Sequence, residues 1–324
     1  MMPRLAGRVA IVTGAGRGLG RAHALCLAAQ GACVVVNDLG VDLTGAGGDV
    51  SPAQQVVREI AEGGGRAVAS SHDVADWEQA RELIEFAVSS YGDLHVLVNN
   101  AGIVRDRTLA NMSEVEWDQV IRVHLKGHAA ATRHAITYWK QRVTATGAPV
   151  KASLIHTTSV AAFTGNFGQA NYTAAKLGII GLSCVAAMEG ARYGVRSNCI
   201  SPSARTRMSA SQRGAEQFLA KPQAAGQFDP WDPANVSPLI AWLAQETCPA
   251  NSQIFQVIGE RILVLSMPPV VHTLKTSGRW TLEDLDRAIP SCLVRPVGLE
   301  ELLGLELGLS AGAGSHADGK KKEE

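Results

Sequence analysis

The chain has 324 residues, of which 46% are hydrophobic, enough to fill the core of a doubly wound α/β sheet. Its 30 basic and 30 acidic residues balance, which excludes the basic field typical of nucleic-acid binding or of attachment to acidic membranes. The six cysteines are scattered without a CxxC pair, so we expect small core residues in a reducing compartment and no metal site.

Neither end of the chain shows a targeting signal. The first predicted strand begins at about Val9, which leaves no room for a signal peptide. No apolar run approaches the roughly 20 residues of a membrane span. The last three residues are Lys-Glu-Glu, unlike a peroxisomal Ser-Lys-Leu signal. We therefore expect a cytoplasmic protein without a membrane partner.

Short β-branched runs alternate with longer helical patterns along the chain, which predicts βαβ units around a parallel sheet. Seven strands are expected, at Val9–Thr13, Cys33–Asp38, Ala67–Ser70, Val96–Asn99, Ser153–Thr158, Val195–Ile200 and Ile254–Ile258. Helices are expected at Leu19–Gln30, Ala53–Gly63, Trp77–Tyr91, Glu114–Thr144, Tyr172–Tyr193 and Val236–Glu246. Continuously apolar strands need helices on both faces. The fold class is therefore α/β: a doubly wound parallel sheet, or Rossmann fold, in a single domain.

The chain is expected to have three parts. Residues 1–266 should form the α/β domain, to which the motifs described next assign dinucleotide binding and catalysis. Residues 267–309 carry apolar and helical signals and should pack on it as a C-terminal extension. Residues 310–324 are small, polar and charged, which predicts a disordered tail.

A glycine-rich turn follows the first strand and opens the first helix. It reads T-G-A-G-R-G-L-G, with Gly14, Gly18 and Gly20 in a T-G-x-x-x-G-x-G pattern and Arg17 and Leu19 between them. Glycine is needed where a backbone turns sharply and approaches a pyrophosphate, which then lies at the helix N-terminus. A turn with a purely structural purpose is the alternative interpretation.

Asp38 ends the second strand, eighteen residues after Gly20. A carboxylate there accepts hydrogen bonds from the adenosine ribose hydroxyls and repels a 2′-phosphate. This favours NAD over NADP, although the cation of Arg17 acts in the opposite direction. Alternatively, Asp38 is a turn residue that opens the long Gly-rich loop at Leu39–Pro52.

Two further segments follow strand ends and are candidates for the same site. Asp73 and Val74 come after the third strand, where an Asp serves equally well as a helix cap or turn residue. Asn100, Ala101 and Gly102 follow the fourth strand. Small residues there allow the backbone to pass close to a bound nicotinamide ribose.

Ser159 ends the fifth strand, and Tyr172 and Lys176 follow on the next helix at a spacing of four, which places them on one helix face. A free tyrosine has a pKa near 10 and is a poor base at neutral pH. A neighbouring ammonium is expected to stabilise the phenolate by roughly 3–4 kcal/mol. Tyr172 could then exchange a proton with a substrate oxygen that Ser159 holds. A lone Y-x-x-x-K pair is usually a solvated helix face, but here it follows the other motifs in order.

Together these motifs resemble the short-chain dehydrogenase/reductase family, which carries the same Gly pattern, the N-N-A-G segment and the Ser, Tyr and Lys. The resemblance implies a nicotinamide-dependent oxidoreductase. It places Asp73 at the adenine amino group and Tyr172 and Lys176 at the nicotinamide ribose. Family members usually associate through the helices at Glu114–Thr144 and Tyr172–Tyr193, so a homodimer or homotetramer is expected.

One position departs from the family pattern. The usual catalytic tetrad adds an Asn in a V-N-L-x-G context, whereas this chain reads V-H-L-K-G and has His124 there. A histidine donates and accepts protons near neutral pH and suits a proton relay. The alternative is a structural histidine that satisfies a local hydrogen bond.

The segments around His124 and over Gly165–Gly178 resemble the (3R)-hydroxyacyl-CoA dehydrogenase unit of peroxisomal multifunctional enzyme type 2 and its bacterial relatives, over about residues 5–265. The resemblance implies hydride transfer between NAD and a (3R)-3-hydroxyacyl-CoA. The segment Ser201–Met208 departs from the P-G turn that is common in the superfamily. Four loop arginines are candidates for the CoA phosphates, with solvated surface residues as the alternative: Arg105, Arg107, Arg205 and Arg207.

Other functions remain open at this point. A hydroxysteroid dehydrogenase, with a sterol-derived substrate, uses the same fold and tetrad. A 3-oxoacyl-acyl-carrier-protein reductase usually takes NADPH, against the indication of Asp38. A non-catalytic dinucleotide-binding regulator is the alternative of a different class, and the intact Ser159, Tyr172 and Lys176 argue against it.

Overall fold

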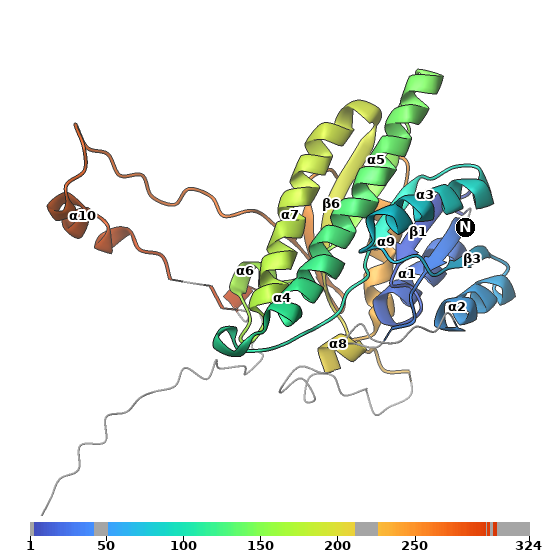
Figure 1. Ribbon diagram of the computed structural model, residues 1–324, viewed down its shortest axis with the longest axis horizontal. Coiled ribbons are helices and arrows are strands. Elements are labelled where there is room, and N and C mark those ends of the chain that lie inside the picture. The colour runs from blue at the N-terminus through green and yellow to red at the C-terminus, as the bar shows by residue number, and fades with distance from the viewer. Residues whose placement is uncertain (1–2, 42–50, 211–225, 296, 299–300, 303–324) are drawn as a thin grey trace, which may run out of the picture. The chain divides into compact units, whose positions relative to one another are not determined.

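The computed structural model describes residues 3–41, 51–210, 226–295, 297–298 and 301–302. Its strands are β1 (Val9–Thr13), β2 (Cys33–Asn37), β3 (Arg66–Ser70), β4 (Val96–Asn99), β5 (Ala152–Thr157), β6 (Val195–Ser203), β7 (Ile254–Ile258) and β8 (Arg261–Leu265). They form one sheet in the order β3-β2-β1-β4-β5-β6-β7-β8 (Figure 1). The strand order reverses between β1 and β4, as in a Rossmann fold, which confirms the predicted fold class.

The α-helices among the described residues are α1 (Gly18–Ala29), α2 (Ser51–Glu62), α3 (Trp77–Tyr91), α4 (Glu114–Ile121), α5 (Gly127–Thr146), α6 (Ala161–Thr164), α7 (Ala170–Gly190), α8 (Arg207–Ala210), α9 (Ser237–Leu243) and α10 (Leu282–Ala288). The longest of them cover the two faces of the sheet in two layers. Helices α1, α2 and α9 share one apolar core with the sheet, and α3, α5 and α7 share a second.

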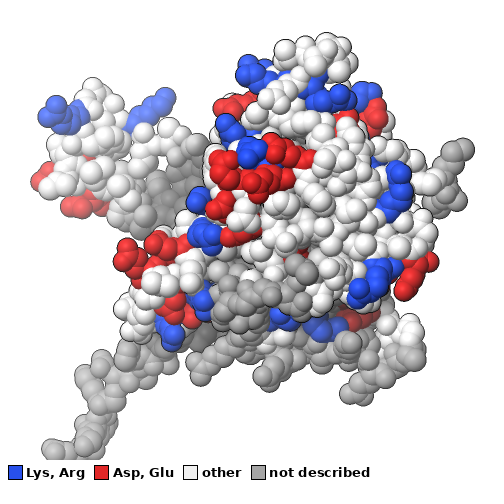
Figure 2. Space-filling view, turned by 45° about the vertical axis from the view of Figure 1, so that its right-hand side comes forward, with Lys and Arg blue, Asp and Glu red and all other residues white. Residues whose placement is uncertain are grey.

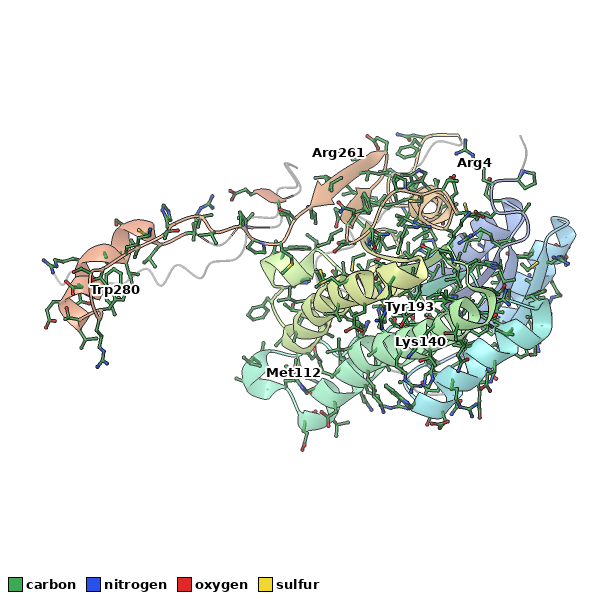
Figure 3. The ribbon with its side chains drawn as sticks, turned by 90° about the horizontal axis from the view of Figure 1, so that it is seen from above. Arg4, Met112, Lys140, Tyr193, Arg261 and Trp280 are labelled. Carbon is green, nitrogen blue, oxygen red and sulfur yellow. The ribbon has the colours of Figure 1, made fainter. Side chains whose placement is uncertain are left out.

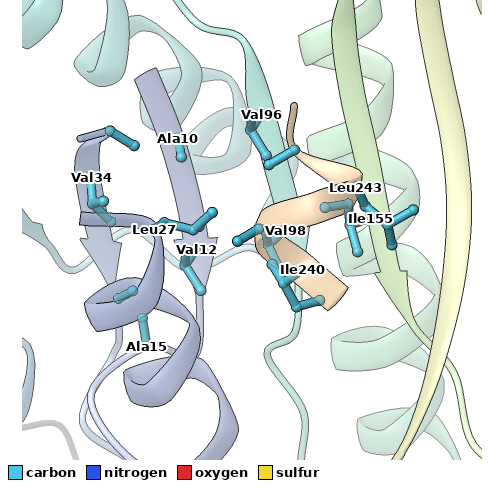
Figure 4. Packing of buried hydrophobic residues seen from close by; sticks show 14 of the residues in the cluster. Ala10, Val12, Ala15, Leu27, Val34, Val96, Val98, Ile155, Ile240 and Leu243 are labelled. Atoms are coloured by element: carbon cyan, nitrogen blue, oxygen red, sulfur yellow. The ribbon is translucent and has the colours of Figure 1, made fainter. Parts of the chain in front are cut away.

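The first of these cores shows why the strands read as continuously apolar. Ala10 and Val12 of β1 and Val98 of β4 point to the same side of the sheet, where Leu27 of α1 and Ile240 of α9 meet them (Figure 4). The intervening residues of the same strands point into the second core. Burial on both faces leaves no position for the polar alternation of a half-exposed strand.

The eighth strand was not predicted. β8 runs antiparallel to β7 and follows it after only Gly259 and Glu260. Gly259 has a φ of +54°, a left-handed conformation that suits glycine at the first position of a two-residue hairpin turn. Only two residues separate the two apolar runs, and the sequence analysis did not interpret them as a hairpin turn. β8 lies at the edge of the sheet, where Figure 3 labels its first residue, Arg261.

The helix predicted over Glu114–Thr144 is interrupted. Between α4 and α5, residues Arg122–Lys126 form a π-helix, in which the chain accommodates one extra residue per turn. Such segments are rare and frequently occur at functional sites. His124 lies in this segment and is 1% exposed. The local widening therefore turns a polar side chain into the interior.

One expectation about apolar runs was wrong. Among the described residues, the segment Ala170–Tyr193, which contains α7, is long and apolar enough to cross a membrane by length and composition alone. Helix α7 packs against β5, β6 and α5, and the side chains of Ala175, Ile179 and Ile180 are buried. These contacts are those of a core helix.

Charge is mixed over the face that Figure 2 shows, where basic and acidic side chains lie next to one another. Ion pairs among the described residues include Arg81 with Glu78 and Glu85 on α3 and Lys151 with Glu246. This distribution agrees with the balanced composition.

The chain divides into two compact units, Met1–Pro269 and Val270–Glu324. The whole sheet lies in the first unit, and the second contains α10, which begins with a capping box between Thr281 and Asp284. The predicted division at residue 266 and the packing of residues 267–309 on the body stay predictions. The predicted disordered tail, residues 310–324, lies outside the described residues.

Candidate active site

The polar motifs of the sequence meet at one edge of the sheet. Gly14, Asp38, Asn100 and Thr158 directly follow the ends of β1, β2, β4 and β5, and these four strands are parallel neighbours. The carboxyl ends of parallel strands form the edge at which α/β proteins bind ligands. Tyr172 and Lys176, on α7, reach the same edge.

The glycine turn between β1 and α1 is too tight for side chains. A Cβ atom on Gly14 would lie 2.8 Å from the Cα of Ala101, and one on Gly20 would lie 2.1 Å from the carbonyl oxygen of Gly14. Gly14 and Gly18 have φ angles of +63° and +52°. Gly18 is exposed and Gly20 is buried. The turn thus brings bare backbone to the surface at the start of a helix.

The N-terminus of α1 has no cap from a side chain. Its N-cap residue, Arg17, makes no capping hydrogen bond with its side chain, which is exposed, and the first turn contains no acidic residue. Leu19 packs against the apolar core below. The first N–H groups of the helix and its positive dipole end therefore remain available to an anion such as a pyrophosphate.

Thr13, which the sequence analysis did not single out, holds two candidate segments together. Its Oγ1 accepts hydrogen bonds from the backbone N–H groups of Asn100, at 2.9 Å, and Ala101, at 3.0 Å. The side-chain amide of Asn100 donates to the carbonyl oxygens of Thr13, at 2.9 Å, and Gly14, at 3.2 Å. The Asn100 side chain therefore holds the backbone of the glycine turn in position. In the sequence, the position of Thr13 at the start of the T-G pattern could have pointed to this role.

Asp38 also contacts the glycine turn directly. Its Oδ2 accepts a hydrogen bond from the backbone N–H of Gly16 at 2.7 Å, and its Oδ1 accepts one from Gly40 at 2.7 Å. The carboxylate is half-buried, and each oxygen keeps further lone-pair capacity for a sugar hydroxyl. Both predicted roles, the turn and the ribose contact, are compatible with this position.

Asp73 is engaged within the chain. Its Oδ1 accepts from the backbone N–H of Ala75 at 2.9 Å, and its Oδ2 forms an ion pair with Arg122 at 2.6 Å. Val74 is buried in the core shared by α3 and α5 and lies close to Gly127. The turn role that the sequence left open for Asp73 is therefore present, and the ion pair to the π-helical segment was not foreseen.

Ser159, Tyr172 and Lys176 form a compact group. The Ser159 side chain acts to lower the pKa of the Tyr172 hydroxyl, and its Oγ accepts a hydrogen bond from the backbone N–H of Ala161 at 3.2 Å. The Nζ of Lys176 lies 5.3 Å from the centre of the Tyr172 ring and donates to the carbonyl oxygen of Thr157 at 2.7 Å. Lys176 is 2% exposed. The four-residue spacing on α7 thus produces the predicted side-by-side arrangement.

Removal from water dominates the protonation of this pair. Burial raises the pKa of Tyr172 to about 12, against a smaller lowering by the Ser159 hydrogen bond. Burial lowers the pKa of Lys176 to about 7. Both shifts favour the uncharged forms. Burial therefore outweighs any lowering of the Tyr172 pKa, and the lowering by Lys176 that the sequence analysis expects stays a prediction.

His124 lies against the tyrosine. The two rings meet edge to face, with centroids 5.2 Å apart and an interplanar angle of 87°. The Nε2 of His124 lies 2.8 Å from the carbonyl oxygen of Ile103. A Cβ atom on Gly102 would lie 2.4 Å from Cε1 of His124. Gly102 thus leaves room for the imidazole, which pins the segment after β4 to the catalytic helix.

Asn171 is a second residue that the sequence analysis missed. It is fully buried, and its side-chain amide donates to the carbonyl oxygens of Arg105 and Glu116, each at 3.0 Å. Its Oδ1 accepts from the backbone N–H of Tyr172 at 2.7 Å. The residue therefore fastens the first turn of α7 to the segment after β4 and to α4. In the sequence, only the position of Asn171 next to Tyr172 could have pointed to this role.

Among the described residues, partners are present for three of the four candidate CoA arginines. Arg105 donates to Gln119 at 2.8 Å, and Arg107 pairs with Glu116 at 3.2 Å. Arg205 makes a two-pronged contact with Asp229 at 2.6 and 2.9 Å.

No group of three or more His, Cys, Asp or Glu residues suited to a metal ion occurs among the described residues.

The comparisons with known proteins agree with this site. A family model described as short chain dehydrogenase matches residues 8–217. A hydroxyacyl-CoA dehydrogenase of Mycobacterium tuberculosis is 45% identical over 280 residues, 85% of this chain and 84% of that protein. The peroxisomal multifunctional enzyme type 2 of Mus musculus is 42% identical over 254 residues, 78% of this chain, which spans 32% of that longer enzyme.

A solved structure extends the match to the fold. The crystal structure of a short chain dehydrogenase from Mycobacterium avium is 46% identical and superimposes with a TM-score of 0.79. The match covers 91% of this chain and 98% of that one. The chain belongs to the short-chain dehydrogenase family and is an oxidoreductase that acts on a CH–OH group.

Proposed function

We propose that the protein is an NAD-dependent dehydrogenase of (3R)-3-hydroxyacyl-CoA. The observation that carries the chemistry is the group of Ser159, Tyr172 and Lys176 at the carboxyl edge of the sheet, beside a helix N-terminus without a cap. The substrate class is supported by the relatives, one named a hydroxyacyl-CoA dehydrogenase and one a peroxisomal multifunctional enzyme.

The dinucleotide site fits the residues present, since the turn is bare of side chains where a Cβ would strike backbone. Gly14, Gly18 and Gly20, with Arg17 and Leu19 between them, would hold the pyrophosphate. Asp38 would accept from the adenosine ribose, and Asp73 and Val74 would line the adenine. Asn100, Ala101 and Gly102 would lie at the nicotinamide ribose, with Tyr172 and Lys176. When bound, the nicotinamide accepts or donates the hydride.

The chain's own residues handle the proton. Ser159 donates a hydrogen bond to the substrate oxygen and fixes its position beside the Tyr172 hydroxyl. In alcohol oxidation the phenolate of Tyr172 takes the proton from that oxygen, and in carbonyl reduction the phenol returns it. The ammonium of Lys176 stabilises the phenolate. His124 holds the tyrosine ring from the side and fixes Ile103, so the acid–base group stays in place.

Cofactor preference gives the first test. We expect the catalytic efficiency with NAD to exceed that with NADP at least tenfold, about 1.4 kcal/mol, because the Asp38 carboxylate repels a 2′-phosphate. Asp38→Asn removes the charge and keeps an oxygen for the N–H of Gly16. This variant should therefore lower the ratio of the catalytic efficiency with NAD to that with NADP. Steady-state kinetics with both cofactors measure this. Equal use of both by the unmutated enzyme contradicts the assignment.

The substrate class is tested with the two stereoisomers of a 3-hydroxyacyl-CoA. We expect NAD reduction with the (3R) form and much less with the (3S) form. Binding energy from the CoA handle orients the reacting hydroxyl, so a simple cysteamine thioester should have a strongly lowered catalytic efficiency. Good turnover of a 17-hydroxysteroid, with both thioester isomers inert, would instead establish the hydroxysteroid alternative.

Assembly into a homodimer or homotetramer is also expected. Leu177, Val185 and Met188 are exposed apolar residues on one side of α7, one of the two helices through which relatives usually associate. Burial of this stripe by a second copy would remove it from water. Light scattering at micromolar concentration should give twice or four times the chain mass, and Met188→Glu should reduce it. A monomeric unmutated protein contradicts this prediction.

A further inference from the structure

Behind the catalytic lysine lies a buried group of polar side chains that the proposed chemistry does not use. His128 of α5 and His156 of β5 stack with ring centroids 5.5 Å apart, and their Nδ1 atoms are 3.3 Å apart. Neither ring is more than 2% exposed. Both elements contact α7, which carries Lys176. The positive charge of Lys176 contributes to lowering the pKa of both imidazoles.

The hydrogen bonds of this group determine where its protons lie. The side-chain amide of Asn99 donates to the Nδ1 of His156 at 3.4 Å and to the Oγ1 of Thr132 at 3.2 Å. The Nδ1 of His156 is therefore an acceptor, so its neutral ring carries the proton on Nε2. In the contact between the two rings, His128 must then donate from Nδ1, which leaves a lone pair on its Nε2.

His124 adds a second lone pair. Its Nε2 lies 2.8 Å from the carbonyl oxygen of Ile103 and 3.2 Å from the backbone nitrogen of the same residue. The shorter contact requires Nε2 to donate, so Nδ1 carries no proton in the neutral ring. Burial and the charge of Lys176 lower the pKa of His124 to about 3, which keeps the ring neutral. Within the described part of the chain, Nδ1 of His124, Nε2 of His128 and Nε2 of His156 have no hydrogen-bond partner.

Lys176 provides N–H donors that match these lone pairs. An ammonium has three N–H donors, and in the described part of the chain one of them meets an acceptor, the carbonyl oxygen of Thr157 at 2.7 Å. Two donors remain on Lys176 and two lone pairs remain on the neighbouring imidazoles. A buried donor or acceptor without a partner costs about 1–3 kcal/mol, so both sets gain when they meet directly or through a buried water.

We propose that His128 and His156, together with His124, are positioning residues that replace bulk solvent around Lys176 and hold its side chain as an ammonium. The proposal rests on the proposed function, since it assigns these residues to the proton chemistry of Tyr172. The other titratable groups facing Lys176 are Tyr172 on its own helix and Cys199 of β6, whose pKa burial raises to about 12, so that it stays a neutral thiol.

The protonation pattern can be measured without cofactor or substrate. Long-range ¹H–¹⁵N NMR correlation of the imidazoles in the full-length protein should show His124 and His156 protonated on Nε2 and His128 protonated on Nδ1, with all three neutral between pH 6 and pH 8. A protonated Nδ1 on His124, a protonated Nε2 on His128 or a charged ring in this range overturns the proposal. This readout does not depend on the substrate assignment.

The effect on catalysis is tested by the pH profile of alcohol oxidation at saturating NAD. His156→Met removes the polar partner of His128 and makes the surroundings of Lys176 more apolar, which disfavours the ammonium and hence the Tyr172 phenolate. The acidic limb of kcat/KM should move to higher pH by about 1 unit. His156→Gln, which keeps a donor and an acceptor, should restore the position of the limb.

A matched control separates this role from burial in general. His134 lies on α5 as well, is buried and also has an unpartnered Nε2, but its contacts are with Trp77 and Arg133. His134→Met should leave the acidic limb in place. An unmoved or downward-shifted limb in folded His156→Met, or an equal shift in His134→Met, overturns the proposal. Where His156→Met does not fold, His128→Leu gives the same test.

Discussion

Tyr172→Phe should lower the rate of alcohol oxidation by about 10²–10⁴-fold, the usual contribution of general acid–base catalysis. The substitution removes only the hydroxyl of the side chain. The ring that packs against His124 and lies near Lys176 stays in place. The effect should therefore fall on kcat, while the melting temperature and the dissociation constant for NAD change little. Steady-state kinetics, calorimetric titration with NAD and thermal unfolding measure the three quantities.

The chain provides a matched control for this substitution. Tyr193 is a second half-buried tyrosine, one residue before Gly194 where the segment containing α7 ends, and Figure 3 labels it. The guanidinium carbon of Arg192 lies 4.7 Å from the centre of its ring. Tyr193→Phe should retain the full rate. Retention of most activity by Tyr172→Phe would remove Tyr172 from the role of acid–base group and would require another proton donor.

The fold could be predicted closely because its strands are buried on both faces. Val9–Thr13, Val96–Asn99 and Ile254–Ile258 begin and end where the sequence indicated. In such strands the apolar run is the strand itself. β8 was missed although its sequence is apolar, because Gly259 and Glu260 were not interpreted as a hairpin turn that returns the chain to the sheet edge. The π-helix around His124 escaped because a single inserted residue leaves the helical pattern on both sides intact.

The sequence predicted how the residues of the candidate site are arranged better than it predicted their protonation. Spacing along one helix is enough to place Tyr172 beside Lys176. Spacing does not show how deeply the pair is buried, and burial is what raises the pKa of Tyr172 and lowers that of Lys176. The histidines behind the lysine come from α5 and β5. Only the packed structure brings His128 to His156, so their sequence positions gave no hint of a shared environment.

Gly20→Ala should weaken NAD binding by about 10–100-fold and destabilise the fold. The added Cβ would lie 2.1 Å from the carbonyl oxygen of Gly14, 2.7 Å from Nδ2 of Asn100 and 2.8 Å from the Cα of Ala15. Two of these three atoms belong to the backbone and cannot turn aside. Overpacking of this kind costs about 1–3 kcal/mol, and about 1.4 kcal/mol corresponds to a tenfold change in affinity.

A second variant can show that the loss of NAD affinity in Gly20→Ala comes from overpacking at the glycine turn. The amide of Asn100 bonds the carbonyl oxygens of Thr13 and Gly14, so a displaced Gly20 pushes the turn away from the position in which it can receive a pyrophosphate. Gly278→Ala adds the same methyl group where nothing lies within 4 Å and should leave NAD affinity and unfolding unchanged. Calorimetric titration measures the NAD affinity of both variants, and thermal unfolding measures their stability. Unaltered NAD affinity in Gly20→Ala would mean that the glycine turn does not form the pyrophosphate site, and the cofactor assignment would lose its structural basis.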